Sequence, residues 1–150
     1  MKTLFQILGI ITFAFVVGAC KTASSSTKPQ PQPENGIIGK YWKLVEINGK
    51  PVDATIPREA FIILQDEDRR VNGNGGCNTL NGTYEISEGG RIKFSQMAST
   101  MVACFNMEIE EGLKRALEVA DNYSLSADGK YLSLNRARMA PMARFEAVLK

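Results

Sequence analysis

The chain has 150 residues with 18 basic and 16 acidic side chains, so its formal net charge is only +2. Because no block of basic residues is interleaved with aromatic residues, the sequence gives no support to nucleic-acid binding. Histidine is absent, which excludes Ser-His-Asp and Cys-His catalytic sets and any metal site that uses histidine.

Residues 1–19 have the pattern of a bacterial export signal. Lys2 supplies a positive charge, and the apolar run from Leu4 to Val17 is shorter than the roughly 20 residues of a membrane-spanning helix. The run ends in Val17-Gly18-Ala19-Cys20, which resembles the lipobox that lipoprotein signal peptidase cuts. The alternative is an ordinary secretory signal with a cysteine at this place by chance. We predict cleavage before Cys20 and acylation of its thiol, which would hold the protein on a membrane.

Residues 20–36 have the composition of a tether. After Cys20 the sequence reads KTASSSTKPQPQPEN and contains no large apolar residue. Such a segment cannot bury enough surface to offset the entropy of ordering it. Its prolines favour extended conformers. Residues 37–150 remain, and their number suits one domain.

Short segments with alternating apolar and polar residues make up most of this domain. They are separated by turn sequences such as Asn48-Gly49 and Glu88-Gly89-Gly90. The pattern predicts about eight short strands. They are expected at 41–47, 61–64, around Val71, and at 83–87, 91–94, 123–126, 131–135 and 144–149.

One segment has helical periodicity instead. Apolar residues recur at spacings of three and four, namely Ile109, Leu113, Ala116, Leu117 and Ala120. Asn106 is the predicted N-cap, and Glu110 with Lys114 forms a favourable i,i+4 pair. We therefore predict a helix over about residues 106–120. Together the elements predict an α+β fold, a mainly antiparallel curved β-sheet or partly open barrel with one helix.

Cys77 and Cys104 are the cysteines that remain once Cys20 is acylated. Outside the cytoplasm a lone pair in a small domain is more often a disulfide than two buried free thiols. Two cysteines without histidine leave too few ligands for zinc. The sequence therefore favours a Cys77–Cys104 disulfide and predicts no metal site.

Two motifs carry a resemblance to a known family. The segment Gly76–Tyr84 reads GCNTLNGTY, residues 97–104 read MASTMVAC, and an earlier segment from Trp42 reads WKLVEINGKP. This arrangement resembles META/HslJ-type domains from about Tyr41 to Ala147. The resemblance implies a compact β-rich fold with one helix on exported or lipid-anchored proteins, with a broad link to envelope stress tolerance and no known reaction. The motif residues, which we interpret as mainly structural, are Gly76, Asn78, Gly82, Tyr84, Met97, Ala98 and Thr100.

The sequence predicts a non-catalytic protein with no cofactor. The glycine-rich segment 73–78 lacks the lysine of a P-loop and opens no helix, so it does not indicate a phosphate site. Our first hypothesis is an exported envelope protein, lipid-anchored through Cys20, that binds or supports an unidentified envelope protein. We expect the outer membrane, because Lys21 replaces the aspartate of the enterobacterial inner-membrane retention signal. The alternative is a carrier whose curved sheet encloses a lipid or other hydrophobic ligand, by analogy with secretion pilotins.

Overall fold

The computed structural model describes residues 36–53 and 56–149 of the chain. The predicted signal peptide, Cys20 and all but the last residue of the predicted tether lie outside these ranges. Within them, no helix has the length and apolar character needed to cross a bilayer.

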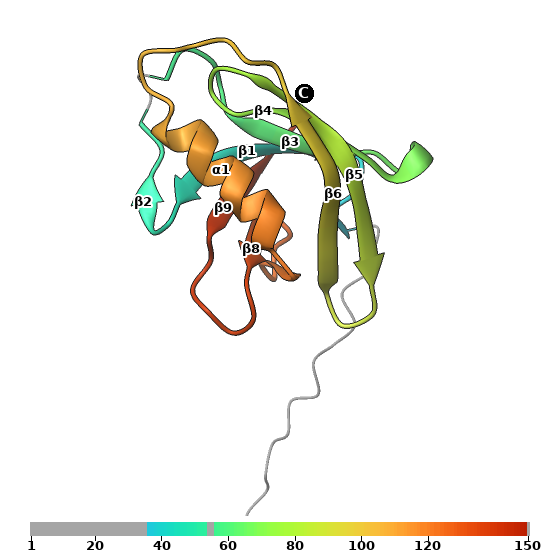
Figure 1. Cartoon of the computed structure of the whole chain (residues 1–150). Helices are drawn as coiled ribbons and strands as arrows, with labels where there is room; N and C mark the ends of the chain where they lie inside the picture. The colour runs from blue at the N-terminus through green and yellow to red at the C-terminus, as the bar shows by residue number, and fades with distance from the viewer. Residues whose placement is uncertain (1–35, 54–55, 150) are drawn as a thin grey trace, which may run out of the picture.

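In the described part of the chain, nine antiparallel strands form one sheet that closes on itself, and one helix packs against it (Figure 1). Neighbouring strands follow the order β2-β1-β3-β4-β5-β6-β7-β8-β9, and β9 also pairs with β1. The predicted α+β class is therefore confirmed. The elements are β1 (Tyr41–Ile47), β2 (Lys50–Pro51), β3 (Phe61–Leu64), the 3-10 turn η2 (Glu67–Arg69), β4 (Arg70–Asn74), β5 (Thr79–Ser87), β6 (Arg91–Ser99), α1 (Glu108–Val119), β7 (Asn122–Leu125), β8 (Tyr131–Asn135) and β9 (Ala143–Val148).

Strand β1 is the seam of the ring, because three strands pair with it. Strand β9 follows one edge from Tyr41 to Ile47, with a bulge between Leu44 and Glu46. On the other edge β3 pairs with the first half of β1, and β2 pairs with its end. The two-residue β2, which the sequence did not predict, completes the coverage of that edge.

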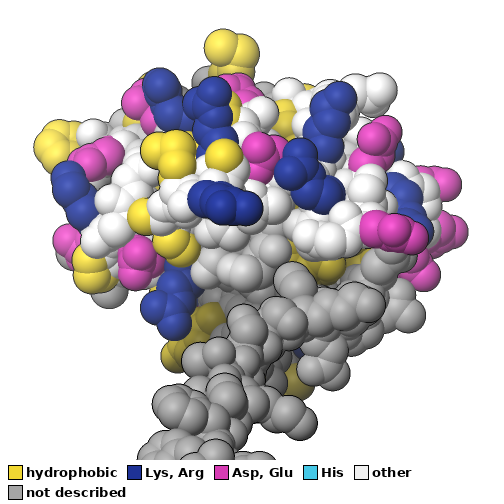
Figure 2. Space-filling view, turned by 90° about the horizontal axis from the view of Figure 1, so that it is seen from below, with side chains coloured by type: hydrophobic (Ala, Val, Ile, Leu, Met, Phe, Trp, Pro, Cys, Tyr) yellow, Lys and Arg dark blue, Asp and Glu magenta, His cyan; other side chains and the backbone are white. Residues whose placement is uncertain are grey.

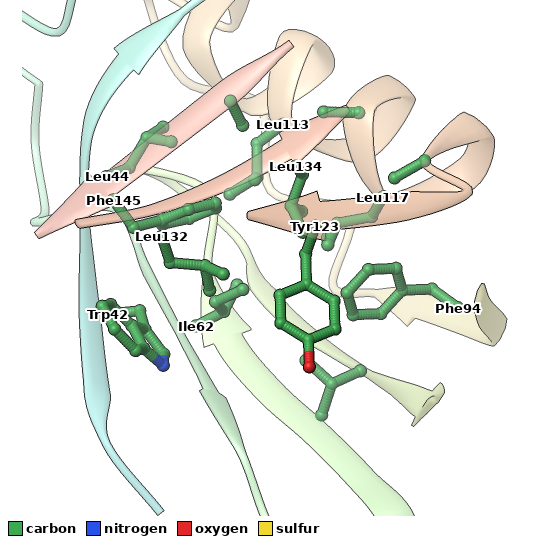
Figure 3. Close-up of a cluster of buried hydrophobic side chains, with 14 of the residues drawn as sticks. Trp42, Leu44, Ile62, Phe94, Leu113, Leu117, Tyr123, Leu132, Leu134 and Phe145 are labelled. Atoms are coloured by element: carbon green, nitrogen blue, oxygen red, sulfur yellow. The ribbon is translucent and has the colours of Figure 1, made fainter. Parts of the chain in front are cut away.

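Large apolar side chains fill the inside of the ring (Figure 3). Trp42, Ile62, Leu132 and Phe145, from four different strands, are each at most 1% exposed. Strand β6 pairs with β7 only between Arg91 and Asn122, so the rest of β6 has no strand partner on that side. Helix α1 lies against β6, β1 and β8. Its leucines join the same buried cluster, so the helix completes the core where the sheet is least continuous.

Strands β5 and β6 are longer than the sequence predicted. The alternation of apolar and polar residues placed strands at 83–87 and 91–94, but their pairing extends back to Leu80 and on to Ser99. A β-bulge interrupts the pairing at Gly82, and Gln96 opposite it has a φ of 52°. Because a bulge adds a residue to one strand, it breaks the two-residue period by which a strand is recognised.

Helix α1 begins two residues later than predicted, and the prediction that Asn106 is its N-cap is wrong. The N-cap is Met107, which makes no side-chain capping bond. The Asn106 side-chain oxygen instead accepts a hydrogen bond from the Glu108 N–H (3.1 Å). An asparagine side chain readily reaches the backbone two residues ahead, so Asn106 closes the turn that leads into the helix.

The described chain joins the ring beside the end of β3. The Gly39 N–H donates to the Leu64 carbonyl (2.8 Å), and the Trp42 indole N–H donates to the Ile37 carbonyl (2.8 Å). Ile37 is completely buried. These contacts fasten the start of the domain at the Leu64 end of β3. The opposite end of β3, Phe61, pairs with Asn74 beside the glycine-rich motif.

The end of the molecule that lies at the bottom of Figure 1 has basic and acidic side chains side by side (Figure 2). The part of this face that can be seen therefore has no extended field of one sign, the feature that steers polyanions or polycations to a protein.

Candidate functional site

The two sequence motifs meet at one end of the sheet. Three segments converge there: the turn between β4 and β5, the loop of residues 100–107 between β6 and α1, and the first turn of α1 (Figure 1). The segments are held together by one disulfide and by hydrogen bonds centred on Asn78.

Glycines and Asn74 shape the turn from β4 into β5. The Asn74 side-chain oxygen accepts a hydrogen bond from the Gly76 N–H (2.8 Å), and the Gly75 N–H donates to the Asn78 carbonyl (2.8 Å). Gly76 has a φ of 105°, a conformation that side chains other than glycine rarely adopt. Gly75 is needed for a different reason, because an added Cβ would lie 2.5 Å from the Cγ atom of Glu110. The turn therefore packs directly against helix α1.

The Asn78 side chain ties this turn to the loop. Its amide nitrogen donates to the Val102 carbonyl (2.9 Å), and its amide oxygen accepts from the Val102 N–H (2.8 Å). The same oxygen accepts a bond from the Thr100 hydroxyl (2.7 Å). One buried amide thus pairs with both backbone groups of a residue 24 positions away, as a neighbouring strand would.

Glu110 of helix α1 completes the network. Its two carboxylate oxygens accept hydrogen bonds from the Asn78 N–H (2.7 Å) and from the Asn78 side-chain amide (3.0 Å). Lys114, one helical turn on, lies 2.8 Å from the same carboxylate. Glu110 is 1% exposed, so the predicted i,i+4 pair exists, but its acidic partner is buried rather than on the surface.

The protonation of Glu110 follows from these contacts. Burial alone would raise the pKa of its carboxyl, but the bonds from Lys114 and Asn78 outweigh burial and hold the pKa below its ordinary value. The carboxylate is therefore charged at neutral pH, and three donors surround it.

Cys77 and Cys104 form the predicted disulfide, with their Cα atoms 6.2 Å apart. The bond joins the turn and the loop beside the Asn78 contacts. A covalent link and a polar network thus hold the same two segments together.

Replacing Gly75 with alanine is expected to lower the free energy of unfolding by about 2 kcal/mol, because the new methyl group collides with Glu110. Urea unfolding of the mature chain measures this cost. In a Glu110→Ala background the Cγ atom is gone and only the Cβ atom, 3.0 Å away, remains, so the same substitution should cost about 1 kcal/mol less. An equal cost in both backgrounds would contradict the contact.

The family model of the META domain matches residues 35–148 of the chain. The chain belongs to the META domain family. No curated protein matches the sequence.

Solved structures share the fold of this META domain at low identity. One NMR structure is 21% identical with a TM-score of 0.61, over 77% of this chain and 94% of that one. An NMR structure from Burkholderia xenovorans is 20% identical with a TM-score of 0.61, over 86% and 97%. The crystal structure of a DUF4847 family protein from Bacteroides vulgatus is 16% identical with a TM-score of 0.51, over 73% and 93%. At such identities the similarity concerns the fold alone.

The remaining motif residues lie along β5 and β6, away from the Asn78 network. An added Cβ on Gly82 would collide with the Met97 sulfur and lie 2.9 Å from the Ser95 carbonyl, so glycine permits the bulge. Tyr84 is buried, and its hydroxyl donates to the Gln65 carbonyl (2.8 Å). Ala98 pairs with Asn81 and is exposed.

Sequence reasoning missed Glu110 as a member of the META domain's polar network. A signal was available, because Glu110 stands three positions before Leu113 and seven before Leu117, on the apolar face of the helix. A carboxylate at such a position needs buried partners, and Asn78 supplies them. The partnership of Asn78 with Val102 had no signal in the sequence, since it uses backbone atoms of an irregular loop.

Outside this network, a hollow of about 310 Å³ lies beside β1. Its lining includes the apolar residues Val45 and Ile56 and the ion pair between Lys43 and Glu59 (2.9 Å). Among residues 36–53 and 56–149, no group of three or more histidine, cysteine, aspartate or glutamate side chains is placed to hold a metal ion.

Proposed function

We propose that this chain is an exported lipoprotein, anchored to the bacterial envelope through Cys20, whose META domain has a non-catalytic binding or support role in stress tolerance. The observation that carries the proposal is the Cys77–Cys104 disulfide downstream of the Val17–Cys20 lipobox sequence. Disulfides persist in oxidising compartments outside the cytoplasm, so both features favour the same location.

The hydrogen bonds that the polar residues of the Asn78 network make to one another favour a non-catalytic role. Asn78, Thr100 and Glu110 use their side chains to bond one another, Lys114 and the Val102 backbone. A general acid or base needs a polar atom within reach of a substrate. The Glu110 carboxylate is 1% exposed and already accepts three bonds, which favours a structural part for it.

The filling of the ring favours binding on the outer surface over enclosure of a ligand. Side chains such as Trp42, Tyr84 and Phe145 are at most 1% exposed and occupy the interior. A carrier of an acyl chain needs an apolar pocket of several hundred Å³ to surround its ligand. The hollow beside β1 is lined in part by the charged residues Lys43, Asp53 and Glu59.

The anchor is tested by growing cells with a labelled fatty acid. We expect label on the wild-type mature chain and its recovery in the membrane fraction. The Cys20→Ala variant should carry no label and should leave the membrane, because cysteine provides the thiol that is acylated. An unlabelled wild-type chain, or one that keeps Met1 in the cytosol, would contradict the proposal.

The support role is tested in the same strains. Deleting the gene should lower survival under envelope stress, and wild-type protein should restore it. Cys20→Ala should restore it poorly although its domain is intact. Unchanged survival of the deletion strain across envelope stresses would count against a support role, whatever the result for the anchor.

A further inference from the structure

The loop of residues 100–107 presents large apolar side chains to solvent. Met101 is 97% exposed, Val102 is 60% exposed, and Phe105 is fully exposed. Three of the five large apolar residues that the described ranges leave exposed are in this one loop; the others are Met139 and Leu149. An exposed group of apolar side chains commonly marks an interaction surface.

The loop lies in a part of the chain without charge. No lysine, arginine, aspartate or glutamate occurs from residue 94 to residue 107, although 23% of all residues are charged. The visible part of the opposite end of the molecule has basic and acidic side chains side by side (Figure 2). The loop's own sequence is therefore less charged than the visible part of the opposite end.

Within the loop, both backbone polar groups of Val102 already have internal partners. Both the N–H and the carbonyl of Val102 bond to Asn78, and the disulfide fixes Cys104. A segment that enters an apolar phase must satisfy its backbone polar groups within the protein. A loop waiting to pair with a partner strand would instead leave such groups free. The bonding of Val102 thus favours an apolar phase over a partner that adds a strand.

The length of chain before the domain allows the loop to reach a membrane. Fifteen residues separate Cys20 from Gly36 and extend to about 50 Å at most. A domain of this size is roughly 35 Å across. The chain joins the ring at the Leu64 end of β3, whereas the loop lies beyond the Phe61 end. The segment between Cys20 and Gly36 is therefore long enough for either end of the domain to face the bilayer.

We propose that the loop of residues 100–107 is a membrane-contact site. It places Met101, Val102 and Phe105 at the boundary between the headgroups and acyl chains of the bilayer to which the protein is anchored through Cys20. This inference rests on the proposed lipid anchor. Apolar side chains of membrane-surface segments settle at this depth, and the acyl anchor keeps the bilayer at high effective concentration around the loop. The acyl anchor and the loop then both hold the domain on the membrane, and the opposite end faces water.

The test uses the mature acylated chain in phosphatidylcholine vesicles whose acyl chains are brominated, a modification that quenches tryptophan on contact. Phe105→Trp places the probe in the loop. Met139→Trp is the matched control, because Met139 is 68% exposed in the connection between β8 and β9, at the other end of the molecule. Trp42 is completely buried, so it adds the same background to both variants.

We expect the brominated lipid to reduce the fluorescence of Phe105→Trp about twofold more than that of Met139→Trp, as suits a probe at the acyl boundary. Adding Met101→Asp to Phe105→Trp should abolish the difference, because the new charge resists entry into the lipid. Unfolding midpoints equal to that of the wild type show that each variant keeps its fold.

Equal quenching of the two variants on floating vesicles would overturn the loop's membrane contact and leave the anchor standing. A chain that does not float with the vesicles has no anchor, and the proposed function and this inference then fall together. Dimers in detergent that Phe105→Ser converts to monomers would assign the loop to a second copy of the chain instead.

Discussion

Replacing Glu110 with alanine is expected to lower the free energy of unfolding by about 3 kcal/mol, one of the two largest effects predicted for this domain. The substitution leaves the Asn78 N–H without its acceptor and removes one partner of the Asn78 amide, both in a buried site. A buried donor that loses its acceptor costs more than an exposed ion pair contributes. Urea unfolding of the mature chain at neutral pH measures the change.

Glu111→Ala is the matched control, because Glu111 is the next residue of the same helix and is exposed. It should change the free energy of unfolding by less than about 0.5 kcal/mol. Equal losses for Glu110→Ala and Glu111→Ala would show that the Asn78 network contributes nothing beyond helix propensity.

The pH dependence of the Glu110 effect has a definite sign. Since contacts lower the pKa of this carboxyl in the folded chain, its contribution is fully present above its unfolded pKa, about 4.3. The contribution disappears as the pH falls through the folded pKa. The stability gap between the wild type and Glu110→Gln should therefore be constant near neutrality and shrink below about pH 4. A gap that widens in acid would contradict the assignment.

Loss of the Cys77–Cys104 disulfide is expected to lower the free energy of unfolding by about 3.5 kcal/mol. The two cysteines are 27 positions apart, and the cross-link restricts the unfolded chain over that loop. The double variant Cys77→Ala, Cys104→Ala should show the loss in urea unfolding. It also removes the covalent hold on loop 100–107, which is then positioned by the hydrogen bonds of Asn78 and Thr79.

A reductant provides the control for this substitution. It should destabilise the wild-type chain by a similar amount and leave the double alanine variant unchanged. Destabilisation of the double variant by the reductant would mean that the reagent acts elsewhere, since Cys20 is the chain's only other cysteine and lies outside the described domain.

The parts of the fold that the sequence predicted are those with a mostly regular local pattern. Strand β8 alternates, β1 alternates up to its bulge after Leu44, β3 is a short apolar run of strand length, and α1 shows the three-and-four spacing of a helix with one apolar face. The end of β6 was missed because the bulge at Gly82 breaks the alternation. Local periodicity identifies an element only while the element is regular.

The candidate site was predicted less completely, for a related reason. The disulfide could be inferred because a pair of cysteines and the pattern of a predicted export signal can be recognised without knowledge of the fold. Glu110 was predicted only as the i,i+4 partner of Lys114, because that rule concerns neighbours on one helix and ignores what packs on it. The bonds from Asn78 to Glu110 and Val102 join residues 32 and 24 positions apart. Only the assembled tertiary structure brings such partners together.

The pairing of the first strand with the last restricts when this domain can fold. Strand β1 completes its hydrogen bonding only when β9, which ends at Val148, lies beside it. A nascent chain that lacks its final residues has two open strand edges and an incomplete core. Folding dominated by such distant pairings is slow and follows synthesis rather than accompanying it. We therefore expect a nascent chain without β9 to remain unfolded, which is the state that the proposed export through a narrow translocation channel would require.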